Sequence, residues 1–97
     1  MSDSLLLKAK INSETAKLPW SNLQRLFAQG KVFYVDSSLD LIETAFEIAN
    51  NEQIKIDQYL QDNLIYRVND DQAKNWYEQN QILWVSVIKP WVLVQEI

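Results

Sequence analysis

The chain has 97 residues, 47% of them hydrophobic and 23% charged, with a formal net charge of −4 at pH 7. This composition excludes intrinsic disorder, which requires far fewer large apolar residues, and predicts one globular domain over residues 1–97. The absence of cysteine and histidine from the sequence excludes disulfides, thiol nucleophiles, histidine bases and zinc sites with nitrogen or sulfur ligands.

The first thirty residues predict two helices. Residues 4–16 have apolar positions spaced for one broad helical face. Pro19 ends this pattern, because the residue before a proline is driven out of helical geometry. Residues 21–24 have the form of a capping box, which predicts the start of the second helix. Gly30 predicts the end of that helix, because a left-handed cap favours glycine.

The middle of the chain predicts a strand, two helices and a second strand. Residues 31–35 and 64–68 are short runs rich in β-branched and aromatic residues. Between them lie two helices, and the second carries Ile56, Tyr59 and Leu60 on its buried side. The first carries acidic residues opposite its apolar stripe. This acidic side is either a solvated outer face or a surface for a basic partner or a divalent ion, and it comprises Asp36, Asp40, Glu43 and Glu47.

The last third of the chain predicts a helix and a C-terminal strand region. Residues 69–72 have capping-box character and start the helix. Residues 82–88 are apolar on both alternating faces, so helices of the chain or a partner must cover both faces. The single short helix before them favours parallel pairing with residues 64–68. Pro90 predicts a bend or an edge position for the residues that follow, because proline cannot donate to a ladder.

These elements predict an α+β (or α/β) fold, in which about five helices pack on a small mixed sheet of three to four strands. Three segments, at residues 12–20, 26–30 and 83–96, resemble a family of small bacterial proteins known as domain of unknown function 2288. The ending Pro-Trp-Val-Leu-Val-Gln-Glu is the most specific part of the likeness, which covers nearly the whole chain. The resemblance implies a single-domain bacterial protein without an assigned activity, and therefore no catalytic residues.

Aromatic and β-branched residues near the C-terminus are the candidate interface. Trp84 lies in the doubly apolar strand, and Trp91, Val92, Leu93 and Val94 follow the expected bend. Large aromatic side chains are common both in protein cores and where proteins meet. The leading hypothesis is a non-enzymatic protein-interaction module, a homodimer joined through the C-terminal strand region. Burial of the same residues in the core is the alternative.

A small polar pocket is the second hypothesis. Asn12, Glu14, Thr15 and Trp20 bring an amide, a carboxylate, a hydroxyl and an indole close together in sequence, which suits a ligand-binding sensor domain. Such residues also satisfy open backbone groups at helix junctions, which is the structural alternative. We expect no cofactor, because Gly30 is the only glycine and phosphate-binding loops require several. We also expect no metal site, because a site for a hard cation needs backbone or amide oxygens and a loop that wraps the ion in addition to carboxylates.

Nucleic-acid binding through the N-terminal third is a weaker alternative. Residues 1–31 hold five basic residues against two acidic ones, although the whole chain is acidic. No apolar run approaches the ~18–20 residues of a membrane helix. We therefore expect a cytoplasmic protein without a membrane partner.

Overall fold

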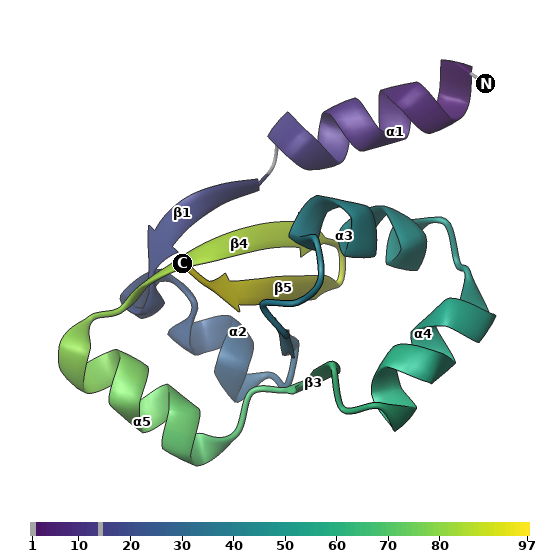
Figure 1. The fold of residues 1–97 in the computed structure, drawn as a ribbon. Helices are drawn as coiled ribbons and strands as arrows, with labels where there is room; N and C mark the ends of the chain where they lie inside the picture. The colour runs from purple at the N-terminus through teal and green to yellow at the C-terminus, as the bar shows by residue number, and fades with distance from the viewer. Residues whose placement is uncertain (1, 14) are drawn as a thin grey trace.

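A mixed five-stranded sheet with the strand order β1-β4-β5-β2-β3 lies at the centre of the computed structural model (Figure 1). The structure describes residues 2–13 and 15–97, and the side chains of residues 6, 7, 9–13 and 15–97. Within these residues the elements are α1 (Ser2–Ser13), β1 (Thr15–Pro19), the 3-10 turn η1 (Trp20–Asn22), α2 (Gln24–Ala28), β2 (Val32–Val35), α3 (Leu41–Ala49), α4 (Gln53–Gln61), β3 (Ile65–Arg67), α5 (Asp70–Gln79), β4 (Ile82–Ile88) and β5 (Trp91–Glu96).

The predicted α+β domain with five helices is confirmed, but the predicted three to four strands fall short of the five in the described residues. The missed strand is β1, whose residues were partly assigned to the first helix. β1 pairs antiparallel with β4, from Thr15 opposite Ser86 to Pro19 opposite Ile82. Its sequence, Thr-Ala-Lys-Leu-Pro, is short and includes Ala, Lys and Pro, which are depleted in strands, so the ladder with β4 is what makes this segment a strand.

The predicted parallel pairing of residues 64–68 with residues 82–88 is wrong. β3 lies at one edge of the sheet and pairs antiparallel with β2, from Phe33 opposite Arg67. β4 pairs with β5 in an antiparallel hairpin, whose two-residue turn contains a cis Lys89–Pro90 peptide bond. β5 also pairs in parallel with β2. The tight turn therefore brings β5 back beside β4 and places it in the middle of the sheet, not at the expected edge.

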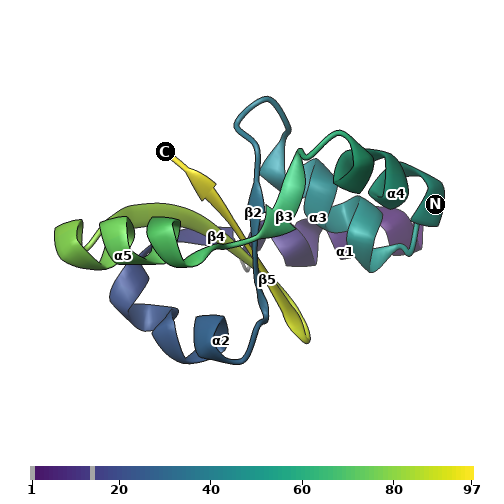
Figure 2. The same ribbon diagram turned by 90° about the horizontal axis from the view of Figure 1, so that it is seen from below.

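Helices cover both faces of the sheet (Figure 2). We call the side with η1, α2 and α5 the first face and the side with α1, α3 and α4 the second face. The core of the first face includes Trp20, Tyr34, Trp76, Leu83 and Val85. The core of the second face comprises Ile11, Val35, Leu41, Ala45, Ile65 and Leu93, with Trp84 packed against it. The predicted cover of both faces of residues 82–88 is confirmed, and of the two alternatives it is the chain's own helices that supply it.

Of the four predicted helix boundaries, those at Gly30 and at residues 69–72 are confirmed, whereas the first helix, expected over residues 4–16, is α1 at Ser2–Ser13. Gly30 ends α2 with φ 72°, and its backbone N–H donates to the Phe27 carbonyl at 2.9 Å. Asn69 and Gln72 form a reciprocal capping box at the start of α5. The capping box expected at residues 21–24 is wrong, because η1 occupies this stretch and Leu23, without a side-chain cap, precedes α2. In the described part of the chain, every helix is too short or too polar to cross a membrane.

Candidate functional site

An apolar groove on the second face is the candidate site. It lies between α4, α3 and the sheet, encloses about 170 Å³, and is lined by Phe33, Ile48, Ile56, Leu60, Ile65, Trp91 and Leu93. Strands β2, β3 and β5 supply the floor, and α3 and α4 supply the walls. Every lining side chain is apolar, so the groove offers hydrophobic contact and no group for acid–base or nucleophilic chemistry.

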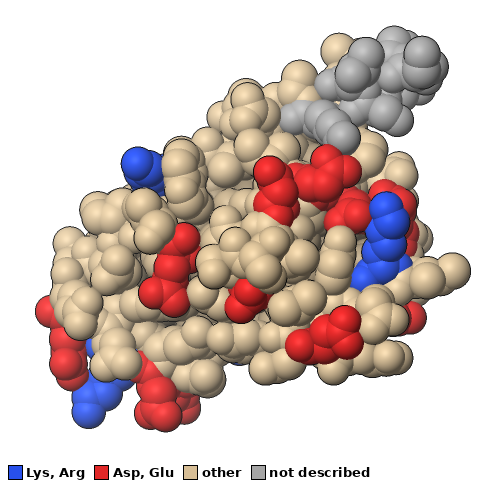
Figure 3. Space-filling view, viewed as in Figure 1, with Lys and Arg blue, Asp and Glu red and all other residues tan. Residues whose placement is uncertain are grey.

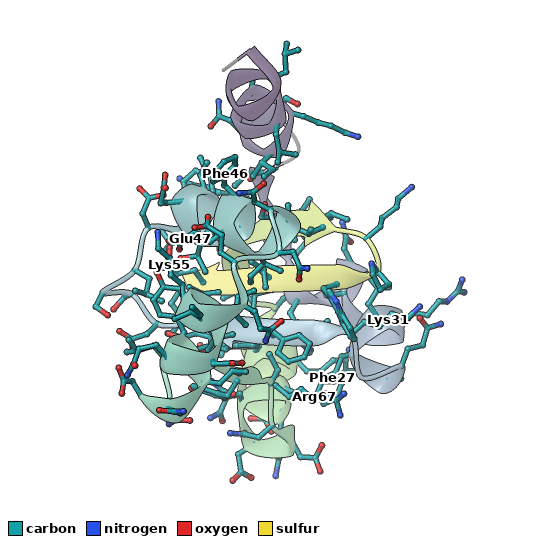
Figure 4. All side chains as sticks on the ribbon, turned by 90° about the vertical axis from the view of Figure 1, so that its right-hand side faces the viewer. Phe27, Lys31, Phe46, Glu47, Lys55 and Arg67 are labelled. Carbon is teal, nitrogen blue, oxygen red and sulfur yellow. The ribbon has the colours of Figure 1, made fainter. Side chains whose placement is uncertain are left out.

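Aromatic and basic side chains meet at the end of the groove nearest the start of β5. The Phe33 and Trp91 rings lie edge to face, with centroids 5.4 Å apart. The Arg67 guanidinium carbon lies 5.7 Å from the Phe33 ring centroid, which is cation–π distance. Lys31 belongs to the same end, because its carbonyl accepts from the Val92 backbone N–H at 2.9 Å. Figure 4 shows Lys31 and Arg67 together, away from the contact between α3 and α4.

Helix α4 forms the outer wall of the groove and is only loosely covered. None of its nine residues, all of which the structure describes, is fully buried. Ile56, Tyr59 and Leu60 were expected on a buried side. They do face the protein, but Leu60 remains 48% exposed. Ile54 is 87% exposed. Part of the apolar surface of α4 is therefore open to solvent.

A buried carboxylate attaches α4 to α3. Glu47 accepts a hydrogen bond from the Tyr59 hydroxyl at 2.7 Å and lies 3.1 Å from the Lys55 ammonium (Figure 4). Hydrogen bonding to Glu47, followed by burial, raises the pKa of Tyr59. The same carboxylate and the nearby Glu52 raise the pKa of Lys55. The expectation that Glu47 belongs to an outer acidic face is wrong, because its side chain is only 6% exposed beneath α4.

The predicted interface residues divide into buried and partly exposed ones. Val92, Leu93 and Val94 are at most 2% exposed, because β5 is the central strand and both faces of the sheet are covered. Their side chains therefore have no surface for a partner in the folded chain. Trp84 is half-buried beneath the Lys17 ammonium, 5.0 Å from its ring centroid. Trp91 is 38% exposed and lines the groove.

The predicted pocket residues are not brought together. Trp20 is buried in the core of the first face, with its ring centroid 5.2 Å from that of Trp76. Thr15 lies toward the second face, where its hydroxyl donates to the Ile11 carbonyl at 2.6 Å and is hydrogen-bonded to Ser86 at 2.9 Å. Asn12 is exposed on α1. The expectation for Glu14 lies outside the described residues. The hydroxyl of Thr15 thus has the structural role expected at a helix junction.

Basic charge is dispersed over the surface. The basic residues described in the N-terminal third, Lys10, Lys17, Arg25 and Lys31, lie on or next to four different elements. Figure 3 shows several acidic side chains close together over the region of α3 and others spread over the rest of the face seen in Figure 1. Among the described residues, no three acidic side chains are grouped so that they could hold a metal ion. This distribution gives nucleic-acid binding no support.

The sequence did not single out Phe33 and Ile48, which line the groove, or Arg67, which lies beside it against the Phe33 ring. Phe33 alternates with the buried Val32 and Tyr34, which marks it as a residue of the opposite face. The sequence of β2, Val-Phe-Tyr-Val, has no polar residue to mark which side chains face which side of the sheet. The sequence also could not show that β5 and β3 flank β2, because strand pairing joins segments far apart in the chain.

Comparison with known proteins agrees with the architecture and with the resemblance in sequence. The structure is similar to the NMR solution structure of PA1075 from Pseudomonas aeruginosa, with a TM-score of 0.82 and 38% sequence identity over 94% of this chain and 84% of that chain. A search of curated proteins found no match. A family model described as "Protein of unknown function (DUF2288)" matches residues 6–96, and the chain belongs to this family.

Proposed function

We propose that this protein is a single-domain protein-interaction module that forms a homodimer through the apolar groove between α4 and the sheet. The observation that carries the proposal is the groove itself, whose seven lining side chains are all apolar and include the partly exposed Leu60 and Trp91. Burying such surface against a partner is favourable by ~25 cal/mol per Å². A cytoplasmic location is part of the proposal, and the absence of cysteine is consistent with it.

Unpaired charges of opposite sign beside the groove favour a second copy as the occupant. Lys31 and Arg67 lie at the strand end of the groove, whereas Asp57 lies on α4 and Asp62 caps its C-terminal end. Among the described residues, none of these four has an ion-pair partner. The two carboxylates accept hydrogen bonds only from glutamine side chains. A two-fold axis places the same patch on both subunits, so the acidic side of one copy can face the basic side of the other.

The homodimer contact differs from strand pairing along the C-terminal segment. β5 has β4 on one side and β2 on the other, so its backbone groups are already paired. Trp91 remains available because its indole lies at the groove and is partly exposed. A stable interface buries about 800 Å² on each partner, so the contact must extend from the groove over the outer surface of α4 and the neighbouring strand ends.

Sedimentation equilibrium of the wild-type chain and two matched leucine variants tests the dimer. Leu60→Asp places a charge in the groove and raises the dissociation constant by at least roughly tenfold, because leucine burial is lost and a carboxylate is desolvated in both subunits. Leu6→Asp makes the same change on α1, at a side chain that is 67% exposed and outside the groove, and leaves the dimer intact. A wild-type monomer at high micromolar concentration would refute the proposal.

Charge reversal tests the two-fold arrangement independently of the apolar contact. Arg67→Glu and Asp57→Arg each weaken the dimer, because each places like charges across the interface. If the two side chains meet between subunits, the double variant restores the opposite charges and association recovers. In a double-mutant cycle, the loss in the double variant is then smaller than the sum of the two single losses. Additive weakening in the double variant would show that this charge pairing does not occur, even if the dimer forms.

A further inference from the structure

A second cavity on the second face differs from the groove in its chemistry. It encloses about 290 Å³ between α1, the end of α3 and the hairpin, and is lined by Leu7, Lys10, Ile11, Ala49, Val87, Ile88 and Lys89. Five lining residues are apolar, and two are lysines from opposite walls, one on α1 and one in the turn between β4 and β5. The cavity thus combines an apolar floor with two positive charges.

The cavity exists because α1 lies along one margin of the structure and its N-terminal end extends past the sheet (Figure 1). Ile11 is 3% exposed and fixes the C-terminal half of α1 to the core of the second face. Leu7, one turn earlier, is only half-buried beside the end of β4. The helix therefore leaves apolar surface of β4 partly open below it.

The two lysines have no counter-charge within the described part of the chain. Neither Lys10 nor Lys89 has an ion-pair partner there, and no carboxylate lines the cavity. Lys10 lies in the last turn of α1, where a positive charge is favoured by the helix dipole. Lys89 has no such role, since it lies in the hairpin turn. The C-terminal end of α3, at Ala49, would repel an anion, so a negative group fits only beside the two lysines.

We propose that this cavity binds a small amphipathic carboxylate, with the acidic head between Lys10 and Lys89 and the apolar body over Leu7, Ile11 and Ile88. The cavity volume lies near the lower end of the range for small-molecule sites, about 300–1,000 Å³, which suits a medium-chain acid. Each methylene buried against the floor tightens binding about fourfold. This site is separate from the groove and does not rest on the proposed dimer.

Three probes of equal chain length separate head-group recognition from apolar binding. Octanoate, 1-octanol and octylamine are titrated below their micelle-forming concentrations while backbone amide shifts are followed by two-dimensional NMR. Octanoate is expected to bind saturably, with shifts centred on Ile11, Val87 and Lys89, and about tenfold more tightly than 1-octanol because of two added charge contacts. Octylamine is expected to bind most weakly. Added salt weakens only the octanoate complex.

Matched charge-neutralising variants complete the test. Lys10→Gln together with Lys89→Gln reduces octanoate affinity to that of 1-octanol, whereas Arg25→Gln together with Lys74→Gln removes the same charge from the first face and leaves octanoate affinity unchanged. Equal affinities of octanoate and 1-octanol for the wild-type chain, or no saturable shifts at the cavity, would overturn the proposal. Repeating the titration with Leu60→Asp keeps this result independent of self-association.

Discussion

The hydroxyl of Tyr59 is expected to anchor α4, and Tyr59→Phe tests this directly. The hydroxyl donates to Glu47 at 2.7 Å, and Lys55 of α4 forms ion pairs with Glu47 and Glu52. Because no residue of α4 is fully buried, apolar packing alone holds this helix weakly. Phenylalanine keeps the ring and its packing but removes the hydrogen bond to the buried carboxylate.

The expected loss follows from the charge and burial of the acceptor. A hydrogen bond to a charged group contributes about 1.5–3 kcal/mol. The Tyr59 side chain is only half-buried, so water can replace part of the interaction, and we expect a loss around or below the lower end of this range, about 1–2 kcal/mol. That free energy corresponds to a roughly 5- to 30-fold increase in the population of the form in which α4 is detached.

Native-state hydrogen exchange measures this population residue by residue. In Tyr59→Phe, the amides of α4 are expected to exchange faster by that factor, whereas those of Val85 and Val94 in the central strands change much less. Tyr77→Phe, at a side chain that is 64% exposed, is the matched control and leaves exchange unchanged. Unaltered exchange in α4 would refute the anchoring role. Equal acceleration in α4 and the sheet would show that α4 opens only with the whole domain.

Three further predictions concern stability. Burial and the hydrogen bond to Glu96 raise the pKa of Tyr34, so the folded state keeps a proton that the unfolded state loses, and stability falls as pH rises above about 10. Tyr34→Phe should make the urea midpoint less sensitive to alkaline pH, and an unchanged sensitivity would contradict this. Asn69→Ala removes the capping box of α5 and should lower stability by about 1 kcal/mol, seen as a melting temperature about 4–8 °C lower. Gly30→Ala should cost about 1–2 kcal/mol in the same melting experiment, because the left-handed φ of 72° strains alanine although its Cβ would meet no atom closer than 4.0 Å. An unchanged melting temperature in either variant would rule out the corresponding role.

Local sequence predicted those features that depend on neighbouring residues. The capping box of Asn69 and Gln72 and the left-handed cap at Gly30 each involve hydrogen bonds over two to five residues of chain. Their geometry is set by residue type at fixed offsets, so the sequence suffices. The doubly apolar strand at residues 82–88 likewise required cover on both faces, and the chain's own helices supply it.

The tertiary structure alone decided which strands pair and which charges are buried. Residues 15–19 become β1 only because β4 offers them a ladder about seventy residues later, and β5 is central because a tight turn returns it beside β4. Glu47 was expected on the solvent-facing side of α3. In the structure, Lys55 and Tyr59 of α4 contact its carboxylate and cover it. The groove also depends on tertiary contacts, because its lining residues come from five separate elements. Family, fold class and the helix boundaries at Gly30 and Asn69 follow from the amino-acid sequence, whereas the candidate site depends on contacts between distant segments, whose partners no local pattern specifies.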